Sequence, residues 1–253
     1  MSAACEYARF RHVFDDGDMT RLGREPEDPR VLAAARNNAE WCDLVCRTHG
    51  AATAFHPDAW VSATRSPPGY PDSVTLHGWA VAADLLTQVD RSPGCSVKDS
   101  FASLDLSGSG FDVLFDAEWI HRPAPAATDI GVLRWSVVET LDELRAWTAA
   151  HEAGAVLRPA LLDDPAVMVL LATDAGGNVA AGVIGNRSRT VVGLSNLFTV
   201  SADPDEAWAG AVAALSAVFP GLPLVGYECG EDLTAAHRAG FTSVGRLRVW
   251  LNA

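Results

Sequence analysis

The segment Tyr227-Glu228-Cys229-Gly230-Glu231-Asp232 places a phenol, a carboxyl group and a thiol directly after an apolar run. A carboxyl group at the end of a buried strand can do acid–base chemistry, because an apolar setting raises its pKa toward neutrality. Glu228 is therefore a candidate general base, acting through water, with Tyr227 beside it. For Glu231 and Asp232 we expect helix capping, because acids stabilise the positive end of a helix.

A second group of reactive side chains, Cys42, Cys46 and His49, is spaced at i, i+4 and i+7, on one face of a helix. Two thiolates and an imidazole are ligands that zinc takes. One helix rarely supplies three ligands, and the sequence shows no complementary pair elsewhere. Because free cysteine is among the most buried residue types, we interpret these cysteines as core side chains and expect no metal site.

The composition limits the classes of partner. Of the 253 residues, 49% are hydrophobic and 20% are charged, which is an ordinary globular balance. The 32 acidic and 19 basic side chains give a net charge of −13, whereas nucleic acid or an anionic membrane surface binds cationic side chains. We expect a small-molecule substrate, no nucleic acid and no membrane. The oligomeric state stays open.

The cysteines and the apolar runs bear on location. The five cysteines, an odd number without a Cys-x-x-Cys pair, are expected to be reduced thiols. The longest unbroken apolar run is seven residues, 166–172, whereas a membrane-spanning helix needs about 20. The first residues show no basic stretch followed by an apolar one. These observations predict a cytoplasmic protein.

Hydrophobic periodicity and turn residues predict the elements that must position these groups. Helices are expected over 31–49, 78–89, 141–152, 205–218 and 232–239. Strands are expected over 59–63, 73–76, 97–101, 111–120, 133–138, 167–172, 179–185, 191–199, 224–228 and 241–251. Helices interleaved with antiparallel strands predict an α+β protein with a mixed α/β sheet.

Two local features bear on the shape of a site. Gly193-Leu194-Ser195-Asn196 within a predicted strand is consistent with a β-bulge. The proline-rich segment 65–71 is expected to be a stiff loop, with a pocket wall as the alternative.

The proline- and alanine-rich segment 122–127 is the best domain break. We expect an N-terminal arm over residues 1–30, a first unit over 31–125 and a second unit over 126–253.

The two halves repeat a pattern of landmarks: Trp79, Gly110 and Trp119 recur as Trp208, Gly240 and Trp250. The first Trp and the Gly-Phe pair are 31 residues apart in one half and 32 in the other, and the Gly and the last Trp are 9 and 10 apart. Near-constant spacing is typical of repeated units. We predict a duplication in which Trp79 superposes on Trp208 and Trp119 on Trp250, with chance in an alanine-rich chain as the alternative.

The second half has the element order strand, helix, helix, three antiparallel strands, helix, strand, helix, strand. Its closing segment 233–245 leads from an amphipathic helix through Gly240-Phe241 into a last strand. In both respects it resembles the GNAT N-acetyltransferase superfamily. The resemblance covers about residues 131–253 and, more faintly, 31–122, so the whole chain resembles two tandem GNAT-like units, the first reduced.

The resemblance implies that acetyl-CoA, or another acyl-CoA, lies as co-substrate in a gap between two parallel strands. In that family, amides of an Arg/Gln-x-x-Gly-x-Gly/Ala loop at the start of the next helix hold the pyrophosphate, which the helix dipole favours. The gap would lie between the strands 191–199 and 224–228. The implied cofactor-binding residues are Asn196, Leu197, Phe198 and Cys229, and the implied catalytic residues are Glu228 and Tyr227.

Three departures from the family pattern concern this site. Glu206 stands where the loop has Arg or Gln, Ala209 replaces its first glycine, and two aspartates lie next to them. Ala236 stands where a tyrosine general acid is frequent, and Cys229 where an asparagine is frequent. We expect acetyl-CoA to bind with a Kd above about 100 μM, because an acid near a phosphate opposes binding.

The sequence-based hypothesis is an N-acyltransferase that transfers an acetyl or acyl group from acyl-CoA to an amine of a small molecule or protein. The amine would attack the acyl carbonyl directly, helped by orientation and by amides of the strand gap. The alternative is a non-catalytic GNAT-like module that binds a small ligand or a partner protein. A hydrolase or isomerase that uses Glu228 is a third, weaker hypothesis.

Overall fold

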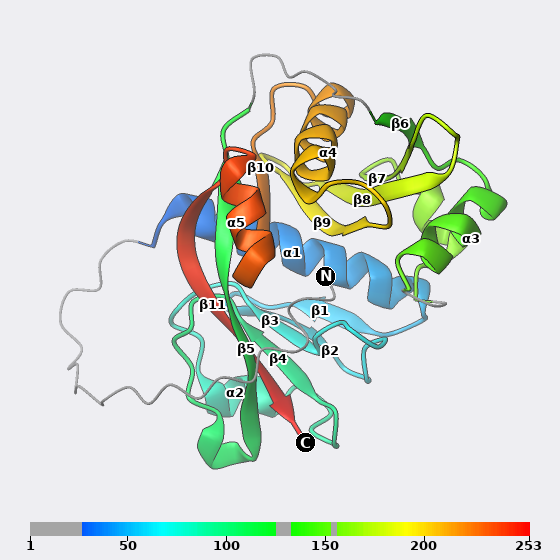
Figure 1. Cartoon of the computed structure of the whole chain (residues 1–253). Helices are drawn as coiled ribbons and strands as arrows, with labels where there is room; N and C mark the ends of the chain where they lie inside the picture. The colour runs from blue at the N-terminus through cyan, green and yellow to red at the C-terminus, as the bar shows by residue number, and fades with distance from the viewer. Residues whose placement is uncertain (1–26, 125–132, 153–155) are drawn as a thin grey trace.

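The structure is a computed structural model that describes residues 27–124, 133–152 and 156–253 (Figure 1). Most of the expected arm 1–30, and the expected boundary between residues 125 and 126, lie outside the described residues.

The described helices and strands confirm the α+β prediction, and all strands belong to one mixed sheet in the order β1-β2-β3-β4-β11-β5-β10-β9-β8-β7-β6. The helices are α1 (Pro29–Thr48), α2 (Ala82–Leu86), α3 (Leu141–Ala150), α4 (Pro204–Val218) and α5 (Gly230–Arg238). The strands are β1 (Thr53–Phe55), β2 (Ala59–Ser62), β3 (Ser73–Thr75), β4 (Ser96–Asp99), β5 (Phe111–Arg122), β6 (Arg134–Val137), β7 (Val167–Thr173), β8 (Val179–Arg187), β9 (Val192–Thr199), β10 (Leu224–Glu228) and β11 (Thr242–Asn252). Two short 3₁₀ helices cover Ser107–Ser109 and Pro159–Asp163.

Polar side chains at the helix starts explain where three of the helices begin. Asp28 accepts a hydrogen bond from the Arg30 amide and precedes Pro29, whose missing N–H costs nothing at a first helical position. Thr140 and Glu143 form a capping box at α3. Asp203 caps α4 in the same way as Asp28 caps α1.

The pairing of the strands follows the same plan in both halves of the sheet. In the first half β1, β2 and β3 pair antiparallel and β3 pairs parallel with β4. In the second half β7, β8 and β9 pair antiparallel and β9 pairs parallel with β10. Each parallel pair is then extended by the last strand of the other half, because β4 pairs with β11 and β10 pairs with β5.

The pairing of β5 with β11, at the centre of this arrangement, is itself symmetric. Ala117 pairs with Leu247, and the residue pairs on one side of this central pair match those on the other side with the two strands exchanged. Leu114 and Val244, each three residues before the central pair, are the bulged residues of their strands. The two longest strands therefore occupy corresponding places on either side of the central pair.

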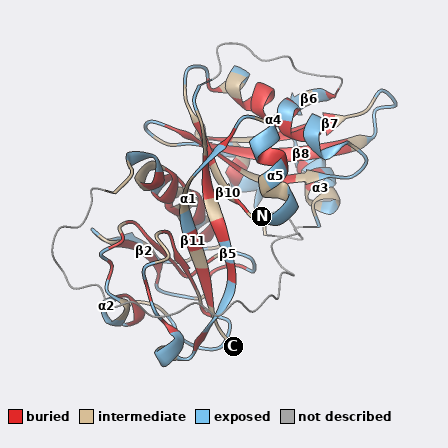
Figure 2. Ribbon diagram, turned by 60° about the vertical axis from the view of Figure 1, so that its left-hand side comes forward, coloured by how far each residue is buried: buried red, intermediate tan, exposed pale blue. Residues whose placement is uncertain are grey.

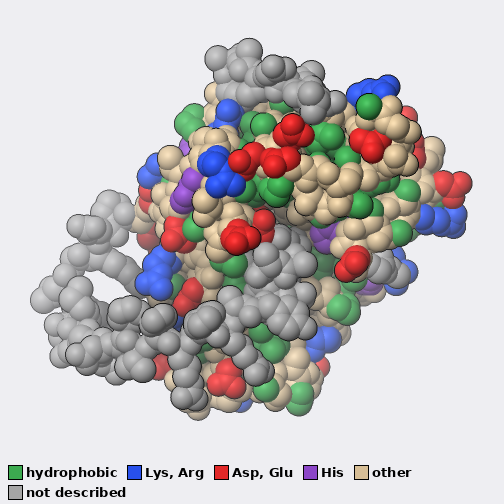
Figure 3. Space-filling model, viewed as in Figure 1, with side chains coloured by type: hydrophobic (Ala, Val, Ile, Leu, Met, Phe, Trp, Pro, Cys, Tyr) green, Lys and Arg blue, Asp and Glu red, His purple; other side chains and the backbone are tan. Residues whose placement is uncertain are grey.

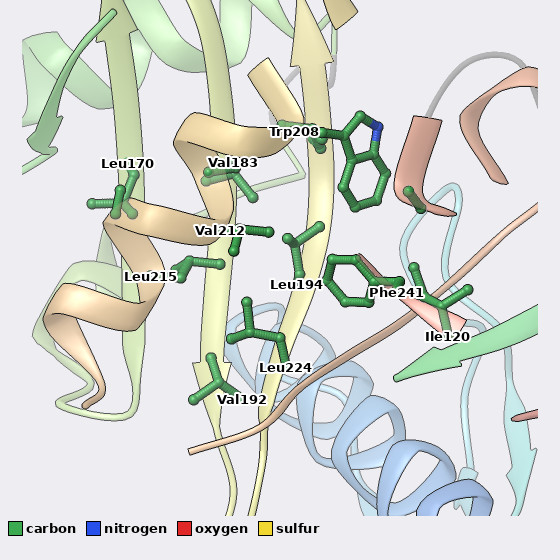
Figure 4. Close-up of a cluster of buried hydrophobic side chains, with 14 of the residues drawn as sticks. Ile120, Leu170, Val183, Val192, Leu194, Trp208, Val212, Leu215, Leu224 and Phe241 are labelled. Atoms are coloured by element: carbon green, nitrogen blue, oxygen red, sulfur yellow. The ribbon is translucent and has the colours of Figure 1, made fainter. Parts of the chain in front are cut away.

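Helices cover both faces of the sheet. On one face α4 and α5 pack on a cluster that includes Ile120, Leu194 and Phe241 (Figure 4). On the other face α1 packs on Trp119 and Leu247. Successive residues of a strand point to opposite faces, so Trp119 and Ile120 serve different cores. Figure 2 shows buried residues along α1 and along the central strands.

The predicted superposition of the tryptophans is wrong. Trp79 lies in a turn between β3 and α2 with 46% of its surface exposed, whereas Trp208 lies buried within α4. Trp119 lies two residues after Ala117, and Trp250 lies three residues after Leu247, so the two tryptophans point to opposite faces of the sheet. The matched spacing along the chain therefore does not correspond to matched positions of these side chains.

The predicted helix 78–89 is shorter than expected, since α2 covers only Ala82–Leu86. The carboxyl group of Glu27 accepts hydrogen bonds from the Gly78 amide and binds His77. These contacts hold residues 77–79 in a turn, and the helix begins only after it. The alanine-rich composition of the segment predicted a longer helix. The contact with Glu27, which is distant in the sequence, shortens it.

The surface agrees with the composition. Among the described helices none is long and apolar enough to cross a membrane. On the face drawn in Figure 3, the described Lys and Arg side chains lie scattered among acidic ones and do not gather in one basic patch.

Leu247, at the centre of the sheet and 0% exposed, should be a critical packing position. We expect Leu247→Ala to lower the free energy of unfolding by about 2–5 kcal/mol, because the substitution leaves a cavity under α1. The matched control is Leu114→Ala on the neighbouring strand. Leu114 is 42% exposed, so its truncation should cost less than about 1 kcal/mol. Chemical denaturation measures both, and equal losses would contradict this assignment of the core.

Candidate functional site

A pocket of about 540 Å³ lies where β9 and β10 end, on the face of the sheet that α1 covers. A site of this size can enclose a small molecule. Both halves contribute to its walls: Asn38, Trp41, Cys42, Pro68, Gly69, Tyr70, Pro71, Lys98, His151, Glu152, Val156, Leu157, Leu194, Ser195, Asn196, Leu197, Phe198, Thr199, Tyr227 and Glu228.

The pocket exists because β9 and β10 stop pairing before they end. They pair parallel, as predicted, but only through Leu224–Val192 and Val225–Gly193. Farther along, β9 has an extra residue opposite Gly182 to Ile184 of β8, and Asn196 has a positive φ of 53°. A bulge bends its strand. The predicted bulge thus lies beside the gap, and it includes Ser195 and Asn196.

Glu228 is the last residue of β10 and lies at this gap with 9% of its surface exposed. Burial disfavours the charged carboxylate and raises the pKa of Glu228 to about 8, with a smaller contribution from Asp232. A carboxyl group with such a pKa can accept and release a proton near neutral pH.

Lys98, the only lysine of the chain, reaches the same pocket from β4 and is 3% exposed. Its ammonium group donates a hydrogen bond of 2.9 Å to Asn38 Oδ1 and lies 4.1 Å from the centre of the Tyr227 ring. Burial lowers the pKa of Lys98 to about 8. Burial also raises the pKa of the neighbouring Cys42 thiol to about 12, so this thiol is neutral at pH 7.

Aromatic side chains form much of the remaining wall. Tyr70 hydrogen-bonds the side chains of Trp41 and Asn196, and burial raises its pKa. Phe198 lies edge-on to His151, with ring centres 5.2 Å apart. Burial lowers the pKa of His151 to about 4, and its Nδ1 atom has no hydrogen-bond partner among the described residues. The pocket therefore combines an aromatic wall with polar groups at defined positions.

The equivalent position in the first half is closed. Asp99 pairs with Arg248 on β11, and Glu228 pairs with Glu118 on β5. Arg248 directly follows Leu247, and Glu118 directly follows Ala117, the two residues of the central pair. The carboxylate of Asp99 accepts hydrogen bonds from the amides of Phe101 and Leu104, and the side chain is 0% exposed. The chain that follows β4 therefore binds its own carboxylate, whereas the pocket reaches Glu228.

On the other face, the start of α4 does not fit a pyrophosphate. The Asp203 carboxylate already accepts hydrogen bonds from the amides of Asp205 and Glu206, which are the donors an anion would need. Asp205 is itself paired with Arg238. The pocket beneath this helix is small, about 80 Å³, and Trp208 lines it.

Five of the six predicted site residues line the large pocket: Asn196, Leu197, Phe198, Tyr227 and Glu228. Cys229 does not line it and is the residue that precedes α5. Cys229 forms a disulfide, so the expectation of five reduced thiols is wrong.

Other expectations about local structure are confirmed. Cys42 and Cys46 are buried in a core with Trp60, and both are free thiols. Glu231 and Asp232 lie in the first turn of α5. Sequence reasoning did not select Lys98, Trp41, Tyr70 or His151. For Lys98 the signal was available, because the single lysine of the chain lies within the predicted strand 97–101.

Comparisons with known proteins address the fold. No protein-family model and no curated protein matches the sequence. A GCN5-related N-acetyltransferase from Kribbella flavida is similar in structure, with a TM-score of 0.55 and 14% identity over 86% of this chain and 95% of that one.

Two further solved structures show the same likeness. A protein of the GNAT family from Novosphingobium aromaticivorans has a TM-score of 0.52 and 11% identity over 87% of this chain and 99% of that one. A protein of unknown function from Staphylococcus epidermidis has a TM-score of 0.51 and 12% identity over 76% and 83%. The chain thus has the fold of GNAT structures, as the resemblance implied.

The buried ammonium of Lys98 should destabilise the unliganded fold in a pH-dependent way. Its pKa is about 8 in the folded protein, against an ordinary lysine value of 10.5, so the unfolded chain binds the proton more tightly. The wild type should therefore gain stability as the pH rises from about 8 to about 10. Lys98→Met lacks this gain and should be more stable than the wild type at pH 7, by about 1–3 kcal/mol.

Chemical denaturation at pH 7 and pH 10 measures the difference, which should shrink at the higher pH. Arg246→Met, at an exposed position of β11, is the control and should show no such pH dependence. A loss of stability in Lys98→Met at pH 7 would contradict the assignment of Lys98 as an uncompensated buried charge.

Proposed function

We propose that the protein is an N-acyltransferase whose acceptor is a small amine bound in the pocket between β9 and β10. The observation that favours this is Glu228, a carboxyl group at the strand gap whose pKa burial raises to about 8. The fold, shared with acetyltransferase structures at low identity, agrees with it.

In this proposal the residues of the chain have separate roles. The aromatic walls around Tyr70 and Phe198 bind and orient the acceptor. Glu228 takes up the proton that the amine must lose as it becomes an amide, directly or through one water. The reaction requires orientation of the acceptor above all, because a held amine reacts as if at very high concentration.

We also infer that the two halves are copies of one unit, divided near residues 125 and 126, with the first unit (31–125) reduced. The symmetric register of β5 and β11 and the equal order of pairing support this. Asp99 and Glu228 then occupy equivalent positions, and the second unit (126–253) holds the site because only its carboxyl group borders the open pocket.

The acyl donor is where the match to the family is poorest. Because Asp203 occupies the amides at the start of α4, the residues present do not fit the pyrophosphate of an acyl-CoA, and we derive no step through that group. The mismatch predicts weak binding of the donor. The acceptor pocket adjoins this region at the strand gap, because Phe198 and Glu228 line both pockets.

The second candidate is a binding module that keeps the acceptor pocket and performs no acyl transfer. The capped start of α4 and the small pocket beside Trp208 favour this alternative. The two candidates differ in whether an acyl-CoA binds and whether an amine is acylated, which the following measurements decide.

Calorimetric titration with acetyl-CoA should give a Kd above about 100 μM, because uncompensated acids face the phosphates. The double variant Asp203→Ser, Glu206→Gln should bind severalfold more tightly, since serine caps a helix without a charge. Asp142→Asn removes an acid from the start of α3 and should have no effect. A low-micromolar Kd for the wild type would contradict the prediction, and complete absence of binding would favour the binding module.

Acetyl transfer to a panel of primary amines, with acetyl-CoA at millimolar concentration, should rise with pH around an apparent pKa of about 8. Glu228→Gln should lower the rate by about 100-fold or more. The Glu228→Gln variant should fold as stably as the wild type. Because the carboxyl pKa is raised, the wild type loses stability as the pH rises from about 4.5 to about 8, and a glutamine avoids this loss. Glu118→Gln, on the neighbouring strand, is the control and should retain the wild-type rate and pH profile.

A further inference from the structure

The chain buries one ammonium group without a counter-ion. Lys98 is 3% exposed, and none of the ion pairs among the described residues includes it. Its contacts are the amide oxygen of Asn38 and the face of the Tyr227 ring. Buried charges in proteins are normally paired, because an isolated ion in an apolar setting is costly.

The neighbours of Lys98 cannot supply the missing negative charge. Cys42 stays neutral at pH 7, since burial raises the pKa of its thiol to about 12. The Tyr227 phenol is neutral as well, since burial raises its pKa. Asn38 is an amide. Lys98 also lines the pocket, so a ligand there is the natural source of an anion.

We propose that Lys98 binds the carboxylate of the pocket's ligand, and that this ligand belongs to the amino-acid class, with a carboxylate, an amine and an apolar or aromatic body. The part of the proposal that concerns the amine rests on the function proposed above. The part that concerns the carboxylate rests on Lys98 alone.

The pocket holds complementary groups for each part of such a molecule. Lys98 comes from β4, and Glu228 comes from β10, three strands away in the sheet, so an ammonium group and a carboxyl group line one cavity. Glu152 is a second acid of the wall. The rings of Trp41, Tyr70 and Phe198 offer an apolar surface for the body of the ligand.

The same wall argues against a phosphate as the anion. A phosphate group is bound best by several donors, typically by the fork of an arginine. The described wall contains one lysine and no arginine. One ammonium group suits a carboxylate, which carries a single negative charge.

Three matched probes test the proposal: L-phenylalanine, phenethylamine, which lacks the carboxylate, and 3-phenylpropionate, which lacks the amine. Calorimetry should show that the wild type binds L-phenylalanine at least about 10-fold more tightly than phenethylamine, as expected for a charge-assisted hydrogen bond. Lys98→Met should remove this difference and leave the affinity for phenethylamine unchanged, which also shows that the variant is folded. Glu228→Gln should remove the advantage of L-phenylalanine over 3-phenylpropionate.

The outcomes separate this inference from the proposed function. If carboxylate binding depends on Lys98 but no amine is acylated, the role of Lys98 stands and the acyltransferase fails. If amines are acylated but Lys98→Met binds all three probes as the wild type does, the acyltransferase stands and the role of Lys98 fails. The inference is overturned if Lys98→Met weakens the binding of all three probes equally. It is also overturned if the wild type binds none of the probes at about 10 mM, which is ten times a millimolar Kd.

Discussion

The exchange of the last strands between the two halves is the constraint on which the rest of the structure depends. The inner strand of each parallel pair has its antiparallel neighbour in the other half, because β4 pairs with β11 and β10 pairs with β5. The exchange joins both halves into one sheet, with Ala117 and Leu247 at its centre. It also brings Lys98 and Tyr227 close enough to interact, although they belong to different halves. The pocket is thus a product of the strand exchange.

The two equivalent carboxyl positions differ in how their negative charge is accommodated. Asp99 receives backbone hydrogen bonds, which close the first half around it and favour its charged form, although burial outweighs them and raises its pKa. Glu228 borders the pocket instead, and burial raises its pKa to about 8. The carboxyl group of Asp99 is hydrogen-bonded within the fold, whereas that of Glu228 borders a cavity. The site is therefore asymmetric although the strand pairing is symmetric. This asymmetry is the physical basis for assigning chemistry to the second half.

Local sequence signals predicted what is local in this structure. The bulge near Asn196 and the position of Glu228 at the strand end follow from glycine placement, apolar runs and their boundaries. The parallel direction of β9 and β10 was implied by the family resemblance. The positions of Lys98, Tyr70 and His151 in one pocket depend on pairing between distant strands, which no short window contains. Trp79 illustrates the opposite error, since a regular spacing was interpreted as structure although Glu27 holds that segment in a turn.

The exchange of β5 and β11 has a consequence for how the chain reaches its native state. Arg248 and Asp116 are 132 residues apart in the sequence, yet they lie side by side in the central ladder. Contacts of such high contact order form late, because a long loop must close before they contribute any stability. On the ribosome, the first half would emerge long before its β4 could pair with β11, and its sheet edge would stay exposed until β11 has been synthesised. Such a nascent edge is a place where chaperones would be expected to act.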